Sequence, residues 1–251
     1  MWWRTEDWES SAGYSFFTTY NNDLPKFNVL DHLVTASLLR KLSLGAFPGQ
    51  AGVQYSYDWL GLEGDEFLTR HTVTLSGAVV EGEMNLTQGF FRYQSKDFAE
   101  GFPRPVKQEQ RDADNCMVGF LHLLRFAQDR HFMKAGYQFD YDQTSGRNYE
   151  YAGHRFSAGG QYTLPWGGLR LKYDFDVQLR NYQHKNTMLP SYAPATKRRY
   201  DEEFTNTARA ELPLPSNFTL AAEFLVTNAR SNIEVFDFDR HVFSLVLSWT
   251  Y

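Results

Sequence analysis

Apolar and polar residues alternate along most of the chain. Between residues 169 and 180, apolar side chains occupy every second position, and charged or amide side chains occupy the positions between them. The same period of two recurs at residues 131–142 and 217–229. This period is typical of a β-strand with one apolar face, because successive side chains of a strand point to opposite faces. The pattern therefore predicts an all-β chain.

Extended to the whole sequence, this pattern predicts about twelve strands. Two of them, at residues 29–42 and 113–126, carry apolar residues on both faces and could also form short helices; we interpret them as strands. Many predicted strands have ten or more residues, whereas strands of soluble proteins have about five or six. The predicted strands lie near residues 11–21, 29–42, 51–61, 66–79, 84–97, 113–126, 131–142, 148–164, 168–183, 198–213, 217–229 and 237–251.

Short and long connections broadly alternate between these strands. The segments GAFPGQ, VEGE, AQDR, PWGG and LPSN follow the even-numbered strands, whereas longer polar segments such as HKNTMLPSYAPATK follow most of the others; GLEGDE is a short exception. Tight turns on one side and long loops on the other are typical of bacterial outer-membrane barrels. We therefore predict a closed antiparallel up-and-down transmembrane β-barrel, with residues 1–251 as one domain and both termini on the tight-turn side.

The main alternative is a soluble β-sandwich or a lipocalin-like barrel, because these also alternate. Aromatic residues make up 17% of this chain, with 15 Tyr and 21 Phe. The apolar positions are rich in Tyr, Phe, Leu and Ala, without the Val and Ile density of a packed core. No stretch approaches the roughly 20 apolar residues of a spanning helix, but a barrel strand presents only alternate residues to lipid. Composition therefore favours the membrane barrel.

Tryptophan residues gather near the predicted strand ends. Trp8 precedes the first predicted strand, and Trp166 lies in a predicted tight turn. Aromatic rings favour the lipid headgroup level, where one part of the ring stays apolar and another can stay hydrated. The predicted membrane-interface aromatics are Trp59, Trp166, Trp249 and Tyr251.

The chain ends in HVFSLVLSWTY, whose large apolar residues fall on one face. This ending resembles the C-terminal assembly signal of bacterial outer-membrane proteins, which has a terminal aromatic residue preceded by apolar residues at alternate positions. The resemblance implies that the chain lies in the outer membrane of a Gram-negative bacterium and that the barrel assembly machinery is a partner.

The last third of the chain is also similar to the C-terminal barrels of tetratricopeptide-repeat outer-membrane proteins, such as the surface lipoprotein assembly modifiers. Segments RRYDEEFTNTARAELPLPSNFTLAAEFLVTNARSN and FDFDRHVFSLVLSWTY carry this resemblance. It implies a secretion-linked pore and a periplasmic domain or partner. The chain lacks the helical repeats of that group, and its predicted strand number is lower. Its start lacks signal-peptide features, so we expect either a protein that is not exported or a mature or excised fragment.

Charge and cysteine content narrow the function classes. The chain has 25 basic and 30 acidic residues, a net charge of -5, which argues against nucleic acid as a partner. Cys116 is the single cysteine, so an internal disulfide or a cysteine-based zinc site is excluded. No cofactor motif occurs, and we predict no cofactor and no bound metal.

The search for catalytic groups gives only weak candidates. His154 and Ser157 are close in sequence, but in a strand they point to opposite faces. Asp237, Asp239 and His241 cluster near the last strand, where we favour a solvated strand end over an acid site or a cation site. We therefore predict that the chain is not an enzyme, with an outer-membrane hydrolase as the least favoured function.

Charged residues on the non-apolar face carry the functional hypothesis. Since both signs are mixed, we expect weak charge selectivity. We predict an outer-membrane channel or translocation conduit, porin-like or secretion-linked, for a small solute, surface polymer or lipoprotein. The alternative is a structural or anchoring barrel whose lumen is closed by salt bridges. The predicted pore-lining residues are Lys134, Asp140, Arg155, Arg170, Lys172, Asp174, Asp176, Arg180, Arg209, Glu211 and Glu223.

Overall fold

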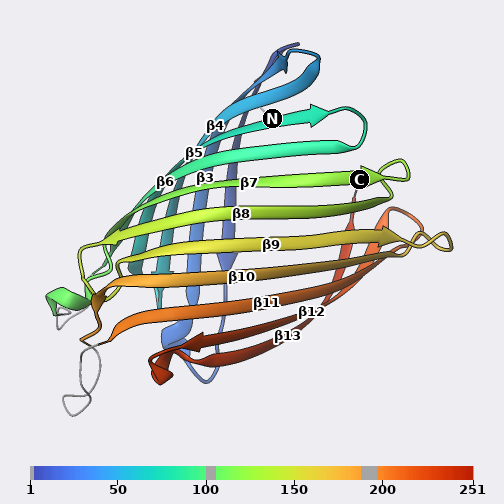
Figure 1. Cartoon of the computed structure of the whole chain (residues 1–251). Helices are drawn as coiled ribbons and strands as arrows, with labels where there is room; N and C mark the ends of the chain where they lie inside the picture. Colours follow the sequence, from blue (N-terminus) through green and yellow to red (C-terminus); the bar gives the residue numbers. More distant parts are fainter. Residues whose placement is uncertain (1–2, 100–105, 188–196, 251) are drawn as a thin grey trace.

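A computed structural model describes residues 3–99, 106–187 and 197–250. Thirteen strands form one antiparallel sheet, in which each strand pairs with the next one along the chain (Figure 1). Three short 3-10 helices, η1 (Pro25–Phe27), η2 (Lys107–Glu109) and η3 (Glu234–Phe236), lie in the connections. The strands are β1 (Trp3–Arg4), β2 (Trp8–Thr18), β3 (Val29–Leu44), β4 (Phe47–Leu62), β5 (Asp65–Glu81), β6 (Asn85–Phe98), β7 (Ala113–Phe126), β8 (His131–Thr144), β9 (Tyr151–Thr163), β10 (Arg170–Lys185), β11 (Arg198–Pro213), β12 (Phe218–Ser231) and β13 (Phe238–Trp249).

The twelve predicted strands correspond to β2–β13. The two segments that could have been helices are β3 and β7, so their interpretation as strands is confirmed. The first predicted strand, at 11–21, was placed too late. Pairing of β2 starts at Trp8, opposite Arg40, and the chain leaves the sheet after Thr18. The additional strand β1 has only two residues, too few to show an alternating pattern.

The predicted closed barrel is observed as a rolled, antiparallel up-and-down sheet. Figure 1 shows the sheet strongly curled, with its first long strands passing behind its last ones. Within residues 3–99, 106–187 and 197–250, no backbone pairing joins β13 to β1 or β2. The sheet therefore has two edges, and only its up-and-down order is established.

The two rims of the sheet differ as predicted. Short turns follow β3, β5, β7, β9 and β11 at one rim, where β2 also begins and β13 ends. Gly45 and Gly82 in these turns have φ of 63° and 73°, a left-handed backbone that strains other residues. The opposite rim holds the longest connections, those after β2, β6 and β10. The connections after β8 and β12 have six residues, as many as the turn after β9, and the turn between β4 and β5 is tight. We call these the tight-turn rim and the long-loop rim.

The two faces of the sheet are strongly unequal. On β13, Phe243, Leu245 and Leu247 are 71%, 66% and 62% exposed. On the opposite face, Thr227 and Ala221 of β12 are 0% and 2% exposed. Side chains crowd together on the concave face of a rolled sheet and spread apart on the convex face. We therefore call the face with Thr227 the inner face and the face with Phe243 the outer face.

Candidate functional site

The candidate site is the charged inner face of strands β8–β13. Backbone register places Lys172 of β10 directly between Gln161 of β9 and Arg209 of β11, and Arg209 opposite Glu223 of β12. Since side chains alternate along each strand, every second residue from these positions also points inward. All eleven predicted pore-lining residues fall on this face.

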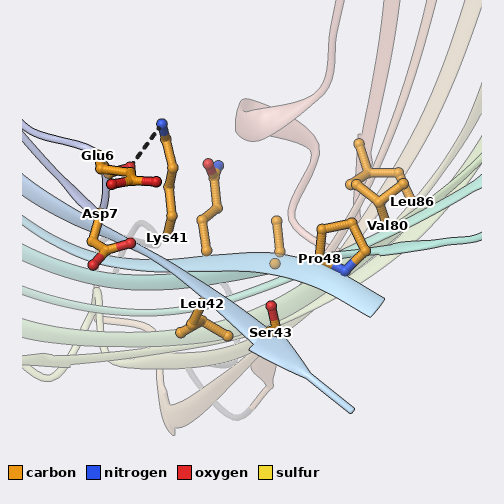
Figure 2. A pocket seen from close by; sticks show the side chains of 11 residues that line it. Glu6, Asp7, Lys41, Leu42, Ser43, Pro48, Val80 and Leu86 are labelled. Carbon is orange, nitrogen blue, oxygen red and sulfur yellow. Dashed lines mark hydrogen bonds between the residues drawn. The ribbon is translucent and has the colours of Figure 1, made fainter. Parts of the chain in front are cut away.

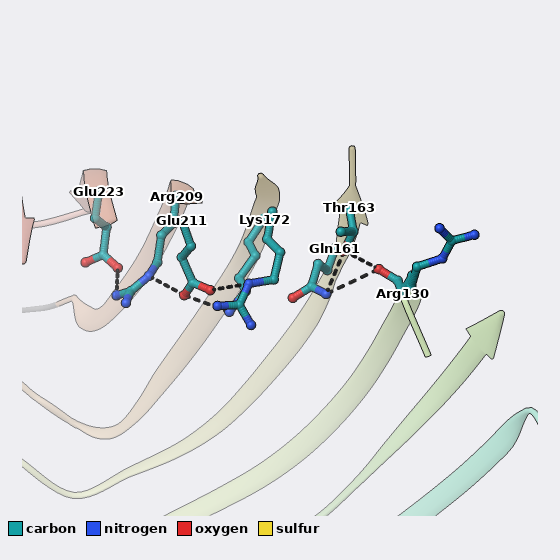
Figure 3. A network of polar contacts seen from close by, with 8 residues as sticks. Arg130, Gln161, Thr163, Lys172, Arg209, Glu211 and Glu223 are labelled. Carbon is teal, nitrogen blue, oxygen red and sulfur yellow. Dashed lines mark hydrogen bonds and ion pairs between the residues drawn. The ribbon is translucent and has the colours of Figure 1, made fainter. Parts of the chain in front are cut away.

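Glu211 is the centre of an ion-pair network near the tight-turn rim (Figure 3). Its Oε1 accepts hydrogen bonds from Lys172 Nζ and Arg209 Nε, each at 2.8 Å. Arg170 Nε lies 3.2 Å from Glu211 Oε2. Arg209 also reaches Glu223, with 3.1 Å between Nη1 and Oε2. Glu211 is only 6% exposed, so this carboxylate depends on its three cationic partners for compensation.

Two more ion pairs cross between strands on the same face. Lys134 of β8 reaches past β9 to Asp174 of β10, with 2.6 Å between Nζ and Oδ1. This reach is possible because Gly159 lies between them, and a Cβ at that position would lie 2.2 Å from the Asp174 carboxylate. Arg155 of β9 bonds Asp176 of β10 at 3.0 Å. The inner wall therefore carries cations and anions that pair across strands, rather than charges of a single sign.

A second polar cluster surrounds Asp140 nearer the long-loop rim. Asn115 Nδ2 and the Tyr151 hydroxyl donate to its two carboxylate oxygens at 2.6 and 2.8 Å. Arg92 donates to Asn115 Oδ1 at 3.0 Å, and the Arg180 guanidinium lies 5.8 Å from the centre of the Tyr151 ring. Every predicted residue in this region therefore has a partner, including Arg180, which also bonds a glutamate of β11 at 3.5 Å.

Sequence reasoning missed several charged residues that form ion pairs on the inner face. Arg70 bonds Asp58 between β5 and β4, and Lys96 bonds Asp142 at 2.7 Å between β6 and β8. These residues also occupy the polar positions of alternating strands, so the signal was present. Register was needed to see which opposite charges meet, and alternation alone does not provide it.

The rest of the inner wall is less charged. Ser11 and Ser37 share a hydrogen bond of 2.6 Å across β2 and β3. Small and uncharged side chains dominate the inner face of β2–β5. They extend less far from the wall than the long charged side chains of β8–β13. The small and uncharged residues include Ser11, Gly13, Thr35, Ser37, Gln54, Ser56, Thr72 and Thr74.

A pocket of about 470 Å³ lies at the tight-turn end of this part of the wall. Figure 2 shows Lys41 pointing to the segment before β2, where its Nζ donates to the Glu6 carbonyl oxygen at 3.2 Å. Pro48, Val80 and Leu86 provide an apolar wall. The segment before β2 therefore lies against the wall at the mouth of the rolled sheet.

The predicted interface tryptophans lie near the two rims. Trp59 is near the long-loop rim, and its Nε1 donates to Glu66 at 3.1 Å. Trp166 is 70% exposed in the turn between β9 and β10, and Trp249 is 60% exposed at the end of β13, beside Phe218. Tyr251 lies outside the described residues.

The weak catalytic candidates are held apart or paired. His154 lies on the outer face, where its Nδ1 bonds the Tyr137 hydroxyl at 2.8 Å, while Ser157 lies on the inner face. Asp239 pairs with Arg230 at 3.0 Å. In the part of the chain that the structure describes, no three His, Cys, Asp or Glu side chains could hold a metal ion together. No helix in that part is long and apolar enough to cross a membrane.

Comparisons with known proteins add one structural likeness. No family model matches the chain, and no curated protein matches it. The beta domain of the Bordetella autotransporter BrkA is a similar solved structure, with a TM-score of 0.42 and 12% sequence identity over 97% of this chain and 98% of that one. A likeness at this level carries no conclusion about what this chain does.

Proposed function

We propose that the chain is a bacterial outer-membrane β-barrel whose inner face lines a conduit for small hydrophilic solutes. The observation that carries this proposal is an apolar band of nearly constant height on the outer face. Four strands that run from the long-loop rim to the tight-turn rim show the same outward pattern. Each bears a polar residue near the long-loop rim and a polar or aromatic residue eight positions later. The outward positions between these two residues hold only apolar or small residues. These pairs are His32 and Arg40, Asp114 and His122, His154 and Tyr162, and His241 and Trp249.

The height of this band matches a bilayer. Eight residues extend about 26 Å along a strand at about 3.3 Å per residue. At a tilt of about 40°, that length covers about 20 Å across the membrane, close to the roughly 25 Å apolar band of outer-membrane barrels. Large outward side chains such as Phe120 and Phe156 fill the band and are about half exposed. A soluble protein rarely exposes so large an apolar surface.

In a bilayer we expect the two edges of the sheet to pair. Unpaired backbone N–H and C=O groups have no partner in hydrocarbon, so an open sheet edge is not stable there. The sheet ends in β13 at one edge and in β2 at the other, where the two-residue β1 covers only Glu9 and Ser10. β2 and β13 have similar lengths, 11 and 12 residues. Their pairing would give a closed barrel of twelve long strands, intermediate between filled small barrels and open porins.

The conduit is supported by the unequal inner wall. Ion pairs between strands hold the charged side chains of β8–β13 against the wall. The strands near the start of the chain, such as β2 and β3, carry small hydroxyl groups instead. This arrangement leaves a polar lumen with both signs of charge, so we propose weak selectivity between anions and cations. Outer-membrane lipid and the barrel assembly machinery are the proposed partners, and we propose no catalytic activity.

Single-channel recording in planar bilayers tests the conduit. The refolded protein should give discrete conductance steps with a small difference between K⁺ and Cl⁻ permeability. The second candidate function is a structural barrel sealed by the ion pairs of the inner face, among them the Lys134–Asp174 pair that reaches across β9. In that case the wild type is silent, and removing one crossing pair with Lys134→Ala and Asp174→Ala opens it. Silence of the wild type would contradict the conduit, whatever the variant does.

A further inference from the structure

The outer face carries a contact that recurs in five hairpins. In each hairpin, a Tyr on the strand that runs toward the long-loop rim bonds a polar side chain on the next strand. That side chain is always two residues nearer the long-loop rim than the register partner of the Tyr. The bonds measure 2.6 to 2.8 Å. The pairs are Tyr14 with His32, Tyr55 with His71, Tyr93 with Asp114, Tyr137 with His154, and Tyr173 with Asn206.

These tyrosine pairs lie at the border of the apolar band that is nearer the long-loop rim. Tyr55 and Tyr93 are both register partners of Val73, so these two neighbouring pairs lie at the same level of the sheet. The histidine or aspartate of a pair is the residue at which the apolar run of its strand ends. The pairs are therefore polar groups at the depth where hydrocarbon meets lipid headgroups.

The three Tyr–His pairs leave one hydrogen-bond donor unused. A Tyr hydroxyl and a neutral His ring carry two donor hydrogens, and the single bond between them uses one. This count is the same for either histidine tautomer. Among the described residues, the side chains of His32 and His71 make no hydrogen bond other than the one to their Tyr. Each of these pairs therefore presents an N–H or O–H donor outward.

Two of these donors are neighbours, and one lies beside a tryptophan. His32 and His71 belong to consecutive hairpins, and the Trp59 ring lies 5.6 Å from the His32 ring between centroids. Glu66 is the nearby carboxylate, and it accepts from Trp59 Nε1. In contrast, Tyr93 donates to Asp114, so that pair leaves no donor and adds a negative charge.

We propose that the Tyr14–His32 and Tyr55–His71 pairs bind the phosphate groups of lipid headgroups, so that lipid with an exposed phosphate gathers around β2–β5. This inference rests on the proposed membrane location. A donor at the border of hydrocarbon costs free energy unless it finds an acceptor, and a charged phosphate oxygen is a stronger acceptor than a neutral one. The aspartate of the Tyr93 pair disfavours the same lipid at β6–β7.

Fluorescence quenching of Trp59 tests this proposal. A variant that keeps Trp59 as its only tryptophan is refolded into vesicles of phosphatidylcholine with brominated phosphatidic acid, or with brominated phosphatidylcholine. We expect an apparent binding constant about five-fold higher for phosphatidic acid, the effect of one net hydrogen bond. Tyr14→Phe combined with His32→Phe in this background should remove most of the preference, because the Phe ring at position 32 still packs on Trp59 but the pair carries no donor.

Two further variants serve as controls. Tyr137→Phe combined with His154→Phe makes the same chemical change at the pair between β8 and β9, far from Trp59, and should leave the preference unchanged. Tyr14→Phe alone keeps the N–H of His32 and should retain the preference, and this expectation can be measured even if the double variant does not fold. Equal quenching by both brominated lipids would overturn the headgroup inference and leave the membrane proposal standing. No quenching by either lipid would overturn both.

Discussion

Glu211 shows how much one inner-face residue can depend on its neighbours. Its carboxylate is buried and contacts Lys172, Arg170 and Arg209. Removal of a buried charge leaves its partners uncompensated, and this loss usually exceeds the net contribution of the pair itself. The free-energy cost of removing the Glu211 charge is lower here than for fully buried partners, because its three cationic partners are about one third exposed to solvent.

We expect Glu211→Gln to lower the free energy of unfolding by about 2 kcal/mol, the range for hydrogen bonds to charged groups. The variant should also shift the reversal potential toward anions, because three cations lose their shared carboxylate. Urea titration and bilayer recording under a KCl gradient measure the two effects. Glu223→Gln is the matched control, since Glu223 is more exposed and has one cationic partner; its effect should be under about 1 kcal/mol. Equal losses for both variants would contradict the central role of Glu211.

At this scale the sequence predicts the face of a residue but not its partners. Alternation placed Asp140 on the polar face, as the structure has it. Its partners Asn115 and Tyr151 come from β7 and β9, and their approach depends on strand register. Register is set by turns and by the packing of whole hairpins, so no local pattern contains it.

Individual strands were predicted well because each one alternates over many residues. The bounds of β11 match the prediction at residues 198–213. Shifts of register at Asn181/Lys185 and at Leu60/Gly61 were not predicted. These irregularities insert two residues in β10 relative to β11 and one residue in β5 relative to β4, so they are visible only when both strands are compared.

The two faces of β13 should respond oppositely to the same substitution. Leu245 is 66% exposed on the outer face, whereas Ser244 lies inward, opposite Glu223. In a bilayer, Leu245→Arg should lower the unfolding free energy by about 2–4 kcal/mol, because an arginine near the membrane midplane loses hydration. Ser244→Arg should cost less, since it can pair with Glu223. Urea unfolding in lipid vesicles measures both values, and a larger loss at Ser244 would reverse the assignment of faces.

For the whole molecule, the membrane proposal predicts heat-modifiable migration. A folded barrel keeps its compact shape in mild detergent, because its backbone hydrogen bonds are all internal. The boiled protein should therefore migrate more slowly on a gel than the unboiled protein. A single band before and after boiling, together with a monomer that stays soluble without detergent, would show that the outer face does not contact lipid.

The order of the strands also has a kinetic consequence. Every pairing in the described sheet joins strands that are consecutive in the chain, from β1 to β13. Such hairpins close short loops, which is the fast part of folding, and they can form in any sequence along the chain. Pairing of β2 with β13 would instead close a loop that includes almost all of the chain. We expect this last contact to set the folding rate, so that substitutions in β2 or β13 slow assembly more than equal changes in β7.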